Sequence, residues 1–111
     1  MKPLSIEKLT RALGNSTRWL ILAELSQDQA LMVTELSVAI RKSVSYTSKQ
    51  LIILRETGAI EQVRGRMYAI PAQYHPAPGI VDYGYGPLRM KPPAPQPPIP
   101  PTPPTETETA Q

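Results

Sequence analysis

The sequence of 111 residues has no cysteine, no phenylalanine and a single histidine, and these absences exclude several kinds of site. Without cysteine there is no disulfide, no thiolate metal site and no cysteine nucleophile. One histidine excludes a multi-histidine zinc site, and neither a Ser/His/Asp set nor a phosphate-binding glycine-rich loop can be assembled. We therefore expect no enzyme, no cofactor and no metal centre.

Long apolar runs are also absent. No window approaches the ~18 apolar residues of a membrane span. The first residues lack an apolar stretch of signal-peptide length. We therefore expect a soluble cytoplasmic protein and no membrane partner.

Proline is scarce at first and abundant later. Of the 14 prolines, 13 lie between Pro71 and Pro104. Residues 1–74 hold ten Lys/Arg and six Asp/Glu, a net charge of +4, whereas residues 75–111 have two Lys/Arg and three Asp/Glu, a net −1. We interpret 1–74 as the folded domain and 75–111 as a Gly/Tyr/Pro-rich tail, mostly disordered, in which residues 92–104 form polyproline II or are disordered. A polyanion would dock on the basic part.

Apolar residues at helical spacing predict helices over 6–13, 16 to about 25, 35–41 and 44–57. The expected N-caps are Ser5, Asn15, Thr34 and Ser43, and the expected stops are Gly14 and Gly58. In the second helix we expect Trp19, Leu22 and Leu25 to face the core, with Ile21 at the margin.

After Gly58 the apolar residues recur every second position, as in a strand, and no longer at the helical period of 3.6 residues. Two short strands, 59–64 and 66–70, flank Gly65 and predict a tight hairpin. Val81, Tyr83 and Tyr85 alternate in the next segment, so an added edge strand there, or packing of this segment back on the domain, is left open. The fold class is α+β, with three to four helices and a short β-hairpin.

The helix over 44–57, preceded by a short helix and a tight turn, has helix-turn-helix geometry. Its first turns are polar and its second half is apolar, as in a helix that reads base edges with one end and anchors in the core with the other. The candidates for base contact are Ser45, Tyr46, Lys49 and Gln50, and those for phosphate are Ser43 and Ser48. Arg64 and Arg66 flank Gly65 and are candidates for the DNA backbone or minor groove.

Three segments resemble ArsR-type winged-helix transcriptional regulators. Residues 13–22, Leu-Gly-Asn-Ser-Thr-Arg-Trp-Leu-Ile-Leu, are similar to the LGNPTRLRIL motif of that family. Residues 33–36 resemble its VxEL motif, and residues 45–60 resemble SxxSxHLxxLxxAGLV. The resemblance implies a winged helix-turn-helix transcriptional regulator that binds DNA, usually as a homodimer. We therefore expect sequence-specific binding of double-stranded DNA, with helix 44–57 in the major groove and residues 60–70 as the wing, by a nucleoid-associated protein.

The chain departs from that family at several positions. The thiolate sensor sites of the family are excluded by the lack of cysteine, and Gly, Pro and Tyr stand where a dimerisation helix is usual. Leu20 and Ile52 replace residues that are usually polar. An alternative function is therefore a winged-helix adaptor that recruits proteins through exposed apolar residues and the polyproline tail.

Overall fold

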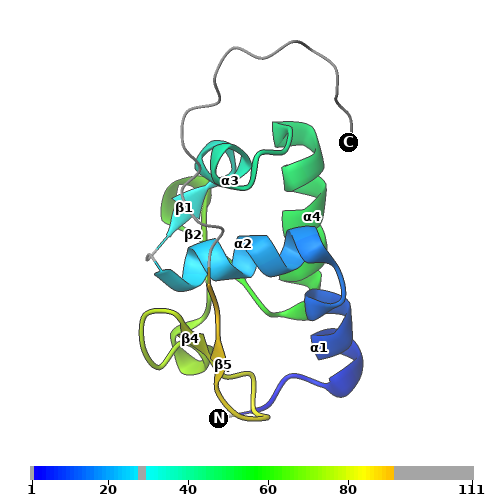
Figure 1. Ribbon diagram of the computed structural model, residues 1–111, viewed down its shortest axis with the longest axis vertical. Coiled ribbons are helices and arrows are strands. Elements are labelled where there is room, and N and C mark those ends of the chain that lie inside the picture. The colour runs from blue at the N-terminus through cyan, green and yellow to red at the C-terminus, as the bar shows by residue number, and fades with distance from the viewer. Residues whose placement is uncertain (1, 28–29, 92–111) are drawn as a thin grey trace.

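The computed structural model describes residues 2–27 and 30–91, which combine four α-helices with two small antiparallel sheets (Figure 1). In chain order the elements are α1 (Ile6–Leu13), α2 (Ser16–Gln27), β1 (Leu31–Met32), α3 (Val33–Ile40), α4 (Val44–Thr57), β2 (Glu61–Val63), η1 (Arg64–Arg66), β3 (Met67–Ala69), η2 (Ala72–Tyr74), β4 (Ile80–Val81) and β5 (Leu88–Arg89). The predicted α+β class is confirmed. None of the helices in the described part of the chain is long and apolar enough to cross a membrane.

Polar side chains begin the first two helices as predicted. The Ser5 hydroxyl accepts the N–H of Lys8 at 3.2 Å. The Asn15 side-chain oxygen accepts the N–H groups of Thr17 and Arg18 at 2.9 and 3.1 Å. These bonds satisfy N–H groups that have no partner inside the helix. A Cβ at Gly14 would lie 2.6 Å from the Thr10 carbonyl oxygen, so only glycine fits between α1 and α2.

The third helix begins two residues earlier than predicted. Thr34 was the expected N-cap, but it lies within α3, which starts at Val33. The Glu35 carboxylate accepts the N–H of Met32 at 2.8 Å, so Met32 occupies the N-cap position. The prediction failed because a carboxylate in the first turn, rather than a hydroxyl before it, satisfies a free N–H group.

The core is built mainly from α2 and the two helices of the α3–α4 pair. Leu22, Leu36, Leu51 and Leu54 are fully buried. The expected orientation of α2 is corrected, because Ile21 is fully buried whereas Trp19 is only partly buried against the core. Figure 1 shows α2 crossing the middle of the molecule, where α1, α3 and α4 all contact it. A helix surrounded in this way buries more than one apolar stripe.

The predicted hairpin forms, and a third strand joins it. The strand order is β1-β3-β2, all antiparallel, with Met32 opposite Met67 and Gln62 opposite Tyr68. The strands are shorter than predicted because the turn is longer, with the 3₁₀ turn η1 centred on Gly65 at a φ of 71°. The sheet therefore connects the start of α3 to the hairpin that follows α4.

Residues 75–91 were assigned to the tail, with packing of residues 79–86 on the domain left open, and the structure packs this segment on the domain. Val81, Tyr83 and Met90 are at most 1% exposed. They lie on and beside β4 and β5, which pair with each other and not with the edge of the β1-β3-β2 sheet. The packed chain thus reaches Met90, beyond the boundary expected at residue 74. The polyproline prediction for 92–104 lies outside the described residues.

Tyrosine side chains fasten this segment to the N-terminal residues and to the end of α4. The Tyr83 hydroxyl donates to the Ala59 carbonyl at 2.9 Å, and the Tyr83 carbonyl accepts the N–H of Leu4 at 2.9 Å. Tyr74 and Tyr85 donate to the carbonyls of Lys2 and Leu4. Burial raises the pKa of Tyr83 far above its ordinary value, so this hydroxyl stays protonated as a donor.

Candidate nucleic-acid interface

The connection between α3 and α4 is a tight turn of three residues. Arg41 ends α3 with a φ of 61°, and Lys42 leads to Ser43. The Ser43 hydroxyl accepts the N–H of Tyr46 at 3.1 Å, as the predicted N-cap of α4. Gly58, at a φ of 87°, ends α4, so both bounds of the predicted helix are confirmed. This geometry fixes α4 against α3 and leaves its first turn at the surface.

One face of α4 is directed toward the core and the opposite face is open. The inward residues are Thr47, Gln50, Leu51, Leu54 and Thr57. Ser45 and Lys49 are exposed on the open face, and Ser48 beside them is half-buried. The structure therefore brings Ser45, Ser48 and Lys49 together on the open face, as the sequence predicted.

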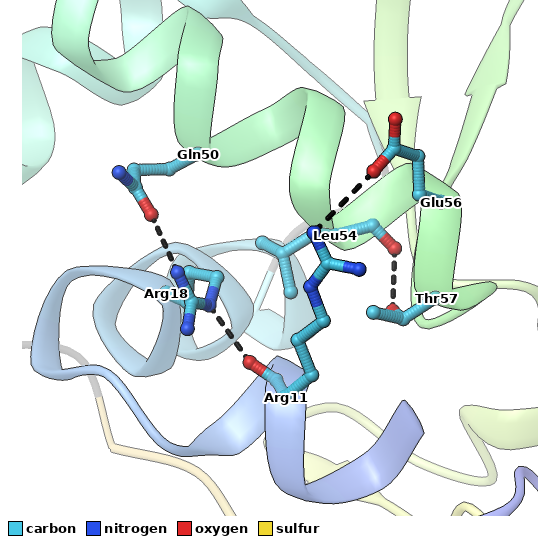
Figure 2. A network of polar contacts seen from close by, with 6 residues as sticks. All are labelled: Arg11, Arg18, Gln50, Leu54, Glu56 and Thr57. Carbon is cyan, nitrogen blue, oxygen red and sulfur yellow. Dashed lines mark hydrogen bonds and ion pairs between the residues drawn. The ribbon is translucent and has the colours of Figure 1, made fainter. Parts of the chain in front are cut away.

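Gln50 was a candidate for base contact, and its place in the structure does not suit that role. The side chain is only 8% exposed, and its amide oxygen accepts the Arg18 guanidinium at 2.9 Å. Arg18 also donates to the Arg11 carbonyl at 2.9 Å, so Gln50 belongs to a polar connection between α1, α2 and α4 (Figure 2). Gln50 therefore holds α4 in position through its bond to Arg18, and the base contact that we expected for it is corrected.

Tyr46 also turns toward α2. Its hydroxyl lies 3.4 Å from the Thr17 hydroxyl, and 38% of the side chain remains exposed. Because Tyr46 and Gln50 are four residues apart, both lie on the side of α4 that faces the first turn of α2. Tyr46 is therefore at the margin of the open face rather than at its centre.

Five exposed cations have no carboxylate partner in the described part of the chain; three lie on α4 or in the turn before it, and two lie on the hairpin. They are Arg41, Lys42, Lys49, Arg64 and Arg66. Arg64 and Arg66 lie in η1 at the tip of the hairpin, as predicted. Arg41 and Lys42 were not among the candidates, although their place next to a predicted N-cap could have identified them. No acidic residue lies in the first turn of α4, so the positive end of the helix dipole is not neutralised by its own side chains.

A cavity of about 620 Å³ lies at the other end of α4. Its lining includes Lys2, Lys8, Glu61 and Tyr85, beside the last residues of α4. It is thus separate from the first turn of α4. Among the described residues, no group of three or more His, Asp or Glu side chains is placed to hold a metal ion.

Comparison with protein-family models and with curated proteins identifies no relative of this chain. The similarity to ArsR-type regulators therefore rests on the three sequence motifs alone.

Proposed function

We propose that this chain binds double-stranded DNA through a winged helix-turn-helix domain, with α4 in the major groove and the β2–β3 hairpin as the wing. The order of α3, a tight turn, α4 and an antiparallel hairpin supports this assignment. A major groove about 12 Å wide admits an α-helix. The role inferred from this binding is sequence-specific transcriptional regulation.

The observation that carries the proposal is the open face of α4. Ser45 and Lys49 are exposed there, and Lys49 has no carboxylate partner in the part of the chain that the structure describes. A lysine can donate to the O6 and N7 atoms of guanine, and a serine hydroxyl can donate or accept. Such side chains are suited to base edges in the major groove.

The flanking cations are suited to the sugar-phosphate backbone. Arg64 and Arg66 on the hairpin are proposed for phosphate or the minor groove, and Ser43 and Ser48 for phosphate. Arg41 joins this set because it is exposed beside the N-terminus of α4. Gln50 leaves the set of base contacts because Arg18 already engages its oxygen.

The adaptor function is the second candidate, and it was based on exposed apolar residues and on the polyproline tail. The packing of Leu20 weakens the first of these two arguments. Leu20 is partly buried against the core, whereas Ile52 is 44% exposed on α4. Of the other exposed large apolar residues, Val44 and Tyr46 also lie on α4, whereas Ile6, Met32, Val38 and Tyr85 lie on other parts of the chain. Protein interfaces are usually built on a contiguous apolar patch, so this scatter favours the DNA proposal.

An electrophoretic shift with random duplex DNA at low salt tests the proposal. We expect a Kd of about 10⁻⁴–10⁻⁶ M at physiological salt and tighter binding at low salt, because phosphate contacts release counterions. Arg66→Ala should weaken binding to this duplex because Arg66 is proposed for phosphate, and Lys8→Ala, which removes the same charge beside the far end of α4, is its control. Binding weaker than about 10⁻⁴ M would favour the adaptor. Equal losses in the two variants would place the DNA surface elsewhere.

A further inference from the structure

Ile52 is an exposed aliphatic side chain on the helix face that we assign to the major groove. It is 44% exposed, and it follows Ser48 and Lys49 by four and three residues. Residues at these spacings are neighbours on a helix surface. An aliphatic side chain therefore lies directly beside Lys49, which we propose for a base, and beside Ser48, which we propose for phosphate.

The charged residues that follow Ile52 on the same face are engaged within the chain. Arg55 donates to the side-chain oxygen of Gln62 on β2. Glu56 pairs with Arg11 of α1 at 3.6 Å (Figure 2). The side chains of the open face that keep no partner in the described residues are thus Ser45, Ser48, Lys49 and Ile52.

The surroundings of Ile52 do not suit a protein partner. Its neighbours on the helix surface are Ser48, Lys49, Arg55 and Glu56, and Val44, the other exposed aliphatic residue of α4, lies eight residues earlier, so Ile52 forms no contiguous apolar patch on this helix. The C5-methyl group of thymine is the apolar feature that the major groove offers, and aliphatic or methyl-bearing side chains contact it. A single aliphatic group among hydrogen-bonding side chains is complementary to a single methyl group among hydrogen-bonding base edges.

We propose that Ile52 contacts a thymine methyl group in the major groove and thereby contributes to sequence preference, an inference that rests on the proposed DNA binding. Lys49 and Ile52 are about 4.5 Å apart along the helix axis. Successive bases on a DNA strand rise by about 3.4 Å. The thymine therefore lies within one or two base pairs of the base that Lys49 contacts, a guanine if the lysine binds O6 and N7.

The full-length protein is first used to select one duplex from a random DNA pool. The test then measures the affinity for two forms of that duplex, the first of which contains thymidine. The second form carries deoxyuridine in place of every thymidine, which removes only the methyl groups. Wild-type protein should bind the uracil form about three- to fivefold more weakly, the effect expected for one buried methyl group. Ile52→Ala should lose a similar factor on the thymine form and should no longer distinguish the two forms.

Val38→Ala is the control, because Val38 is 78% exposed on α3 and lies off the α4 face. This variant should show the same ratio of affinities for the thymine and uracil forms as the wild-type protein. Because both substituted residues are exposed, their thermal unfolding should match wild type. Equal wild-type affinity for the two forms, or discrimination retained by Ile52→Ala, overturns the inference and leaves DNA binding standing. Selection that enriches no duplex overturns both this inference and the proposed sequence specificity.

Discussion

Removal of residues 75–111 should unfold the domain, whereas removal of 92–111 should not. The first deletion takes away Val81, Tyr83 and Met90, which are at most 1% exposed. Complete burial of a side chain of this size contributes about 1.5–3 kcal/mol, so the three together contribute about 5–9 kcal/mol. A domain this small has a total stability near the lower end of about 5–15 kcal/mol, so its folded state would not survive the loss.

Circular dichroism melts of the full chain and of chains ending at Lys91 and at Tyr74 check this prediction. We expect superimposable cooperative transitions for the first two and no cooperative transition for the third. The Tyr83→Ala variant of the full chain separates packing from chain length and should melt at a markedly lower temperature. A chain ending at Tyr74 that melts cooperatively within a few degrees of the full chain would refute the reasoning.

Three substitutions extend these predictions. Leu54→Ala should cost about 2–5 kcal/mol of unfolding free energy in denaturant titrations, because Leu54 is fully buried; a loss below about 1 kcal/mol would mean that the site collapses around the cavity. Gln50→Ala should cost about 1.5–3 kcal/mol by removing a charge-assisted bond, yet keep the wild-type preference between selected and scrambled DNA, unlike a base contact. Gly84→Ala should lower the melting temperature more than Gly86→Ala: both have positive φ, but a Cβ at Gly84 would lie 2.2 Å from the Pro3 side chain and one at Gly86 meets nothing within 4 Å.

The sequence predicts the helices well where local signals determine their ends. Ser43 and Gly58 identify both bounds of α4, and Ser5 and Gly14 identify those of α1. Gln50 could also have been placed correctly, because it lies four residues before Leu54 on the inward face. Its polar amide led to the prediction of a base contact, although its helical register with Leu54 indicated a buried position.

The contribution of residues 75–91 could not be predicted because long-range contacts determine it. Tyr83 is buried through bonds to Leu4 and Ala59, far away in the sequence. The segment is rich in glycine and proline, and β4 and β5 contain two residues each, too few for a recognisable strand period. Composition alone therefore indicated a tail, although Val81 and Tyr83 carried the alternating pattern.

The most direct test of the account is the salt dependence of binding to one selected and one scrambled duplex. Lys49→Ala should lose about 1–3 kcal/mol on the selected duplex and much less on the scrambled one, because Lys49 is assigned to a base. Arg66→Ala should weaken both alike and reduce the slope of log K against log salt by about 1, because Arg66 is assigned to the backbone. Equal losses for both variants on both duplexes, or no measurable binding by wild type, would contradict the assignment of α4 as the helix that reads DNA.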